Sequence, residues 1–163
     1  LNKDIDIFIV SNMNVVIKEE QFKISNIYYT EPIQNIIMDN SQFIKIVYSN
    51  QDIMMSGIFL LVELKHITKE SYFKKIKITY DTSLNKNILN RIYEIENQLL
   101  QKYNIHKKIQ RKIIYDTLNN GVIKLFPNNE NDLINNNNSF ILKISGIWEN
   151  DTEYGLTYKL LCI

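Results

Sequence analysis

The stretch FILKISGIWENDTEYGLTYKLLCI, residues Phe140–Ile163, decides the fold because it has the pattern of a β-hairpin that closes a sheet. Its first part, Phe140–Ile144, is a run of β-branched and aromatic residues, and Ser145-Gly146 permits a bend or a bulge. The polar segment Glu149–Glu153 contains turn-forming residues, and Tyr154–Leu161 is a second run of strand-forming residues. The stretch therefore predicts two antiparallel strands at the end of the chain.

Length and composition are those of an ordinary folded domain. The 163 residues are enough for a core of their own, and we expect a single domain over residues 1–163. Hydrophobic residues make up 45% and charged residues 23%, as in globular proteins. The formal net charge is only +1, so any anionic partner must be bound by a local patch of the surface.

Cysteine content and hydropathy bear on the location of the protein. The single cysteine, Cys162, excludes a disulfide framework within the chain and is compatible with a reducing compartment. The longest apolar run, Ile58–Val62, is far shorter than the roughly 18 residues that span a bilayer. Leu1–Val10 carries Asp4 and Asp6 within its apolar pattern, unlike a signal peptide. We therefore expect an intracellular protein of the host nucleus or cytoplasm, or a virion-associated one, without a membrane partner.

The residue usage indicates an A/T-rich genome. The chain contains no alanine and has arginine only at Arg91 and Arg111, whereas lysine, asparagine, isoleucine and tyrosine are abundant. The abundant residues have A/T-rich codons and alanine has G/C-rich ones, so we expect a large DNA virus, a cytoplasmic plasmid or a parasite as the source. Lysine-rich patches therefore carry less weight as a sign of nucleic-acid binding.

Short runs of strand-forming residues separated by polar turns predict further antiparallel strands ahead of the hairpin. Gly57 lies within one run and is a good position for a bulge where a strand bends. In another run apolar and basic residues alternate, so Phe73, Lys75 and Lys77 are expected on one face. The predicted strands are Ile5–Val10, Val15–Ile17, Phe22–Ile24, Phe43–Tyr48, Ile53–Leu64, Tyr72–Tyr80 and Val122–Phe126.

Helical spacing occurs in one part of the chain. Apolar residues recur every three or four positions over Asn85–Tyr103, which predicts an amphipathic helix. Ile105–Leu118 is expected to form a second helix, ended near Gly121 in the left-handed conformation. Ile33–Met38 is expected as a helical turn or a loop, and Asn128–Asn138 as an exposed loop. Together the elements predict an α+β fold: an antiparallel β-barrel-like (OB-like) core with an inserted helical segment at about 84–118 and a C-terminal β-hairpin.

The chain lacks a recognisable catalytic or metal-binding motif. The two histidines, His66 and His106, lie in different elements and have no neighbouring nucleophile or metal ligands. The glycines are scattered, so no phosphate-binding loop is expected. Glu149, Asp151 and Glu153 alternate as cation ligands can, but a solvated polar turn is the favoured interpretation. We expect a protein that is not an enzyme, with no catalytic residue, no cofactor and no metal.

Two clusters of basic residues favour nucleic-acid binding. The densest basic segment, Lys102–Lys112, contains no acidic residue. Its candidate contact residues are Tyr103, Lys107, Lys108, Arg111 and Lys112. A second cluster, Lys74, Lys75 and Lys77, lies on a predicted strand beside aromatic residues. Cationic side chains neutralise phosphates and exposed aromatic rings stack on bases, so both clusters suit a single-stranded nucleic acid. The competing interpretation places the aromatic side chains in the core.

The closing hairpin resembles the end of OB-fold single-stranded DNA-binding proteins of short-tailed phages and large DNA viruses. The likeness lies in Gly146-Ile147-Trp148, the acidic turn after it, and the final strand with Tyr154–Lys159. It implies a non-catalytic protein that coats single-stranded DNA in viral or plasmid replication. By the same resemblance Trp148, Tyr154 and Tyr158 are candidate stacking residues, and Lys143 and Lys159 candidate phosphate contacts.

Two features depart from this pattern. The chain ends in apolar residues rather than in an acidic tail, and on a regular strand Tyr158 and Lys159 point to opposite faces. The alternative function is a viral structural or assembly subunit, such as a capsid or scaffold protein, with no catalytic activity. The expected partners are single-stranded DNA and, in either case, further copies of the chain or other replication or virion proteins.

Overall fold

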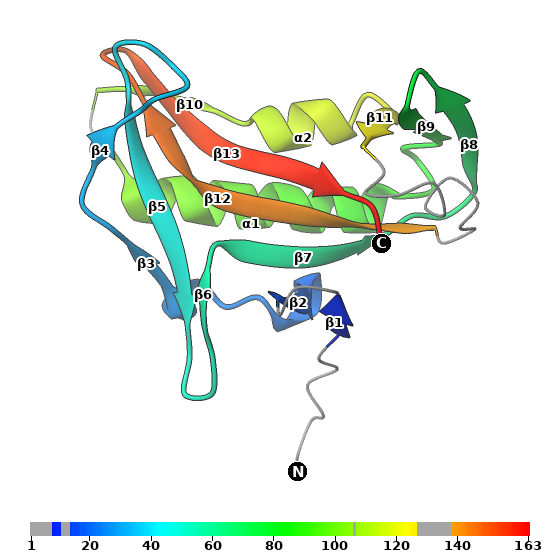
Figure 1. Cartoon of the computed structure of the whole chain (residues 1–163), viewed down its shortest axis with the longest axis horizontal. Coiled ribbons are helices and arrows are strands. Elements are labelled where there is room, and N and C mark those ends of the chain that lie inside the picture. Colours follow the sequence, from blue (N-terminus) through cyan, green and yellow to red (C-terminus); the bar gives the residue numbers. More distant parts are fainter. Residues whose placement is uncertain (1–7, 11–13, 106, 127–137) are drawn as a thin grey trace.

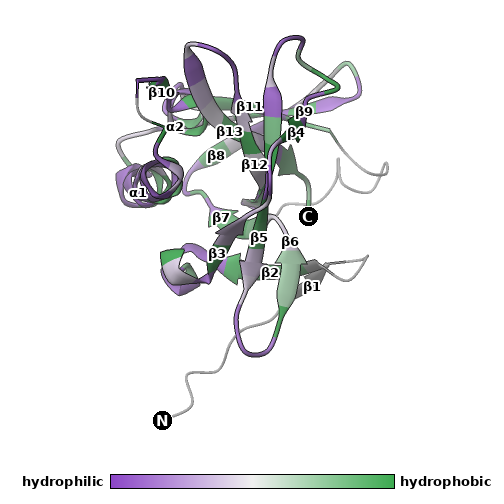
Figure 2. Cartoon of the chain, turned by 90° about the vertical axis from the view of Figure 1, so that its left-hand side faces the viewer, coloured by the Kyte–Doolittle hydropathy of each residue, from purple (hydrophilic) through white to green (hydrophobic). Residues whose placement is uncertain are grey.

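The computed structural model in Figure 1 has an α+β architecture, as predicted. The structure describes residues 8–10, 14–105, 107–126 and 138–163. Within them a large β-sheet, a small β-sheet and two α-helices are present. Both helices lie on the same side of the large sheet (Figure 2). The opposite side of that sheet faces the viewer in Figure 1.

The large sheet contains ten strands in the described residues. Their bounds are β1 Phe8–Val10, β2 Asn14–Lys18, β3 Ile27–Tyr29, β4 Ile33–Gln34, β5 Gln42–Ser49, β6 Met54–Ser56, β7 Ile58–Glu63, β10 Ile109–Arg111, β12 Ser139–Glu149 and β13 Glu153–Leu161. One path runs β1-β2-β7-β12-β13-β10, and β5 branches from β12 with β3, β4 and β6 beside it. This path has two separate ends, so in the described residues the sheet is open and is not closed as the predicted barrel would be.

Strand β12 is shared between two partner strands on the same edge. Its first part pairs with β7 from Ser139 to Ile144, and its second part pairs with β5 from Gly146 to Glu149. The register with β13 shifts between Ile144 and Gly146, which confirms the predicted bulge. Gly57, between β6 and β7, has φ +94° and donates its N–H to the carbonyl of Ile46 at 2.8 Å. The chain therefore turns at Gly57 from β6, which pairs with β5, into β7, which pairs with β12.

A small sheet lies at one end of the large one. It consists of β8 (Ile67–Tyr72), β9 (Lys75–Tyr80) and β11 (Val122–Leu125), in the order β11-β9-β8. All pairs in it are antiparallel. A single bridge between Phe126 and Leu161 joins it to β13. The two sheets therefore meet along the C-terminal strand.

The helices cover the core side of the large sheet. Helix α1 (Lys86–Tyr103) buries Leu89, Ile92, Ile95 and Leu99 against strand residues, as expected of its apolar stripe. Helix α2 (Ile113–Leu118) buries Ile114 and Leu118 in the same cluster. Short 3-10 turns at Glu19–Gln21 and Ile24–Asn26 connect β2 to β3.

A buried carboxylate joins the two helices. Glu96 of α1 is fully buried, and its carboxylate accepts hydrogen bonds from the backbone N–H groups of Ile114 at 3.0 Å and Tyr115 at 2.9 Å. Burial raises the pKa of Glu96, and these two hydrogen bonds oppose that rise. The first N–H groups of a helix have no acceptor within the helix, so Glu96 caps α2 and fixes it on α1.

Several sequence predictions are confirmed. The helix predicted over Asn85–Tyr103 is α1, and the closing hairpin is the pair β12 and β13. Gly57 interrupts the strand predicted around it, between β6 and β7. Gly121 adopts the left-handed conformation with φ +71°. Ile33–Met38, expected as a helical turn or a loop, contains the short strand β4 followed by bends, so the helical turn is wrong.

Three predictions are wrong. Phe22–Ile24 forms no strand, because one 3-10 turn precedes it and a second begins at Ile24. Tyr72–Tyr80 is not one strand, because Phe73 and Lys74 form the turn between β8 and β9. Of the described residues in Ile105–Leu118 only the last six are helical, because residues 109–111 pair with the edge of β13.

Some predicted features fall outside the described residues. These are residues 5–7 of the first predicted strand, His106, and residues 127–137, which hold most of the predicted Asn-rich loop.

We predict that Gly57→Ala destabilises the protein by about 2 kcal/mol or more, because a Cβ there would combine a positive φ with a clash. The added atom would lie 2.8 Å from the carbonyl oxygen of Ile144. Urea denaturation measures the change. Ser56→Ala, at an exposed neighbouring position, is the control and should stay within about 0.5 kcal/mol of the wild type. Equal midpoints for both variants would show that the kink at Gly57 does not determine stability.

Candidate functional site

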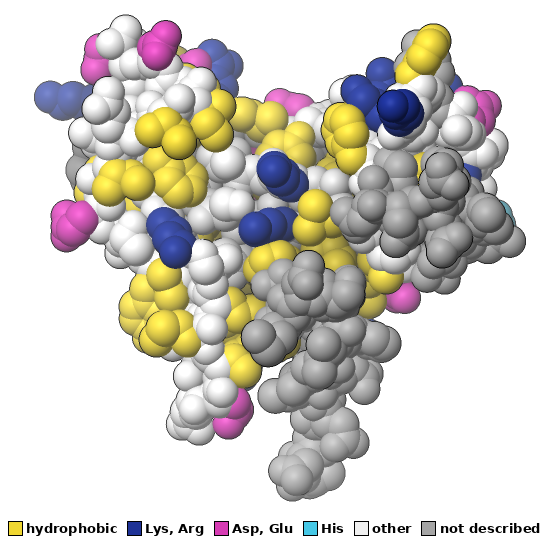
Figure 3. Space-filling view, in the orientation of Figure 1, with side chains coloured by type: hydrophobic (Ala, Val, Ile, Leu, Met, Phe, Trp, Pro, Cys, Tyr) yellow, Lys and Arg dark blue, Asp and Glu magenta, His cyan; other side chains and the backbone are white. Residues whose placement is uncertain are grey.

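The candidate site is the face of the large sheet that the helices do not cover, here called the outer face. Residues alternate along each strand, so the neighbours of the core residues point to this side. In the described residues it carries Phe43 and Lys45 from β5, Phe59 from β7, Lys143 and Trp148 from β12, and Thr157 and Lys159 from β13. Figure 3 shows lysine or arginine side chains among hydrophobic ones over β5, β12 and β13.

Two lysines lie directly opposite each other on this face. Lys143 of β12 pairs in register with Lys159 of β13 on one side and with Phe59 of β7 on the other. The Nζ atom of Lys143 lies 5.2 Å from the centroid of the Phe59 ring. Among the described residues no carboxylate forms an ion pair with either lysine. Like charges in register on adjacent strands destabilise a sheet, and the Phe59 ring offsets part of that cost for Lys143.

Two aromatic rings lie over glycines of the outer face. Phe43 and Trp148 are in register on β5 and β12. A Cβ at Gly146 would lie 2.6 Å from the Phe43 ring, and one at Gly155 would lie 3.0 Å from the Trp148 indole. Because glycine has no Cβ, the Phe43 and Trp148 rings can occupy this space. Trp148 is only 9% exposed, so it offers an edge rather than a full ring face for stacking.

The outer face continues onto the small sheet. Residues joined by a bridge share a face, so Phe126 lies on the same side as Leu161. Phe126 is 62% exposed, and the Nζ atom of Lys75 lies 4.6 Å from its ring centroid. Lys77 shares this face with Lys75, as predicted, and its Nζ atom lies 3.2 Å from the Glu70 carboxylate. Lys74 lies in the exposed β8-β9 turn.

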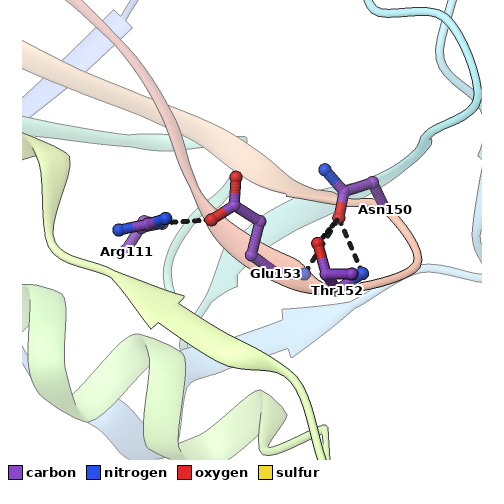
Figure 4. A network of polar contacts seen from close by, with 4 residues as sticks. All are labelled: Arg111, Asn150, Thr152 and Glu153. Carbon is purple, nitrogen blue, oxygen red and sulfur yellow. Dashed lines mark hydrogen bonds and ion pairs between the residues drawn. The ribbon is translucent and has the colours of Figure 1, made fainter.

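The predicted basic segment is largely neutralised by the rest of the protein. The Nζ atom of Lys108 lies 3.6 Å from the Glu149 carboxylate. Arg111 pairs with Glu153, which follows the Asn150 turn shown in Figure 4. Lys112 donates to the Tyr93 hydroxyl at 2.7 Å and lies over that ring. Of the predicted contacts in this segment, Lys107 is exposed and lies at a positive φ of 77°.

The three tyrosines predicted as contacts lie on the helix side of the sheet. Tyr154 is 1% exposed, accepts a hydrogen bond from Gln110 at 2.7 Å, and packs edge-on against Tyr103. Tyr158 shares a 2.8 Å hydrogen bond with Thr117. Burial raises the pKa of Tyr103 to about 12, helped by the charge of Glu149 and a hydrogen bond to it. These rings are therefore placed to stabilise the fold rather than to stack on a ligand.

Thus the structure brings together Lys143, Lys159 and Trp148 of the predicted site, with Lys75 and Lys77 on the adjoining small sheet. It adds Phe43, Lys45, Phe59 and Phe126, which the sequence analysis did not select. The alternation in Phe43–Tyr48 is a signal that could have indicated Phe43 and Lys45. Phe59 and Phe126 had no such signal, because strand pairing alone places them beside Lys143 and Lys75.

A polar pocket of about 500 Å³ lies at the β12-β13 turn. Carboxamide, carboxylate and lysine side chains line it, among them Gln42, Lys108 and Glu149. None of the described residues that line it is aromatic, so they provide no stacking surface. Within the described part of the chain no group of three or more potential metal ligands occurs, and no helix has the length and apolar character to cross a membrane.

Comparison with known proteins gives no relative: no protein-family model, curated protein or solved structure matches this chain. The chemistry of the outer face is therefore the basis for a functional proposal.

We predict that the free energy of unfolding falls as the pH rises from about 10 to about 12. The Tyr103 hydroxyl has a raised pKa in the folded state, so it keeps its proton in this range while the unfolded chain loses it. Tyr103→Phe should therefore show a shallower fall in urea titrations at successive pH values. Tyr28→Phe, which alters a ring that is 56% exposed, is the control. Identical slopes for wild type and Tyr103→Phe would contradict this assignment.

Proposed function

We propose that the protein binds single-stranded DNA on its outer face, without dependence on sequence and without catalysis, in viral or plasmid replication. The observation that carries the proposal is the cross-strand pair Lys143 and Lys159, which lies among Lys45, Phe59 and Thr157. A sheet that places two cations in register gains stability when a phosphate backbone lies between them.

The aromatic residues support a single-stranded ligand. Successive bases of a single strand are free to stack on exposed rings, whereas those of a duplex are paired and stacked internally. Phe126 offers the most exposed ring of the outer face and carries Lys75 over it. Phe59 is 4% and Trp148 9% exposed, so the stacking argument on the outer face rests on Phe126, beside the cation of Lys75. An OB-like core remains part of this proposal.

A different surface favours the alternative function, a structural or assembly subunit. The loop after β4 exposes Ile36 at 97% and Ile37 at 90%, and Ile33 beside it at 61%. The carboxamide of Asn35 accepts the N–H groups of Ile37 at 3.0 Å and Met38 at 3.4 Å, which holds the loop in this shape. A fixed loop with exposed isoleucines suits a contact with a second copy of the chain.

We predict that Lys159→Glu weakens binding to oligo(dT) while raising stability. The change turns a repulsive cross-strand pair into an attractive one worth about 0.2–1 kcal/mol, and it removes a phosphate contact. A fluorescence-anisotropy titration over a salt series should show a slope of log K against log salt reduced by about 1. Thermal unfolding measures the gain in stability.

The matched control is Lys86→Glu. It makes the same charge change at an exposed position in the first turn of α1, where an acidic residue also favours the folded state. Its affinity for oligo(dT) should remain close to that of the wild type. Wild-type protein that does not bind oligo(dT) at low salt would overturn the proposed function, and an equal loss in both variants would remove the outer face as the site.

For the loop after β4 we predict that Ile36→Ser with Ile37→Ser leaves the free energy of unfolding within about 0.5 kcal/mol of the wild type, because neither side chain is buried. If the loop joins copies of the chain, light scattering will give the wild type a larger mass than the variant. Equal masses at all concentrations would contradict self-association through this loop.

A further inference from the structure

The turn between β8 and β9 has an unusual residue at its tip. Phe73 and Lys74 connect the paired residues Tyr72 and Lys75 and have φ values of +43° and +60°. Two-residue turns with two positive φ values normally contain asparagine, aspartate or glycine, because larger side chains are strained there. The Phe73 side chain is nevertheless 82% exposed, so most of its surface can reach a ligand. Strained residues of this kind cluster at functional sites.

The surroundings of this tip are basic and aromatic. Lys74 is exposed beside Phe73, and Lys75 follows with its Nζ atom over the Phe126 ring. Phe126 in turn bridges to Leu161, two residues beyond Lys159 on β13. Lys75 and the exposed ring of Phe126 therefore lie between the Lys143–Lys159 pair and the tip. Figure 3 shows the indented outline of the molecule between its two raised ends.

We propose that Phe73 is a base-stacking residue at the end of the single-stranded DNA path, with Lys74 and Lys75 holding the adjacent phosphates. This inference rests on the proposed function and deepens it, because it extends the site from the large sheet to the β8-β9 turn. The occupant is the same single strand, since the cations around the tip complement phosphate and a free base can stack on an exposed ring. We expect a short strand to occupy the large sheet alone and a longer strand to reach Phe73 as well.

Phe73→Asn separates binding from stability. Asparagine tolerates positive φ, so this variant should be at least as stable as the wild type in thermal unfolding. Its affinity for an oligo(dT) of about 16 nucleotides should fall about tenfold, since one base–aromatic stack is lost. Its affinity for an oligo(dT) of about 5 nucleotides should not change, because the large sheet is intact. Thr79→Asn, at an exposed position on β9, is the control and should bind both oligonucleotides like the wild type.

Phe73→Trp gives a direct signal of stacking. The only other tryptophan, Trp148, is 9% exposed, so a new indole at the tip dominates the solvent-accessible fluorescence. The longer oligonucleotide should quench this signal and the shorter one should not. Unchanged affinity of Phe73→Asn for the longer strand, with wild-type binding intact, would overturn this inference and leave the proposed function standing.

Failure of the proposed function has a different signature, because the wild type would then bind neither oligonucleotide. A membrane contact is a further outcome of the Phe73→Trp experiment. A blue shift on phosphatidylserine-containing vesicles, without quenching by oligo(dT), would replace the nucleic acid with a lipid surface and overturn the inference.

Discussion

The close approach of backbones around the bulge of β12 is the constraint on which the rest of the structure depends. A Cβ at Gly146 would lie 2.3 Å from the carbonyl oxygen of Ile44, and one at Gly57 would lie 2.8 Å from that of Ile144. Only glycine fits at such distances. Because both positions are glycine, β12 can pair with β7 along its first part and with β5 along its second part. The hairpin of β12 and β13 thereby joins the ten described strands into one sheet.

This arrangement gives the large sheet two chemically different sides. On the helix side, Ile44, Leu142 and Leu156 join the apolar stripe of α1, and Glu96 and Tyr154 are buried with hydrogen-bond partners. No described buried side-chain nitrogen or oxygen lacks a partner. The outer face keeps its lysines at the surface. The helix side therefore holds the main core, whereas the outer face combines Lys143 and Lys159 with a smaller buried cluster of Val16, Phe59 and Ile141.

The cations of the described residues fall into those that bind other parts of the protein and those that form no ion pair with a carboxylate. Lys108 and Arg111 have carboxylate partners, and Lys102 donates to the carbonyls of Ile24 at 2.9 Å and Ile27 at 2.7 Å. These cations hold the segment after α1 against neighbouring elements. Lys143 and Lys159 instead lie beside each other, at a cost to the sheet that binding of an anion would remove. The basic segment Lys102–Lys112 is therefore a weaker indication of an anion-binding site than the paired residues Lys143 and Lys159.

The sequence by itself determined the features that depend on neighbouring residues: α1, the closing hairpin with its bulge, the turn at Gly57 and the left-handed Gly121. It also indicated Lys143, Trp148 and Lys159 of the candidate site. Only the tertiary structure decided that residues 109–111 form a parallel edge strand rather than a helix, and that Tyr154 is buried. It alone placed Phe59 beside Lys143 and Phe126 beside Lys75. The physical reason is that hydrogen bonding and charge compensation between distant segments fix these features, and local propensity does not record which segments will meet.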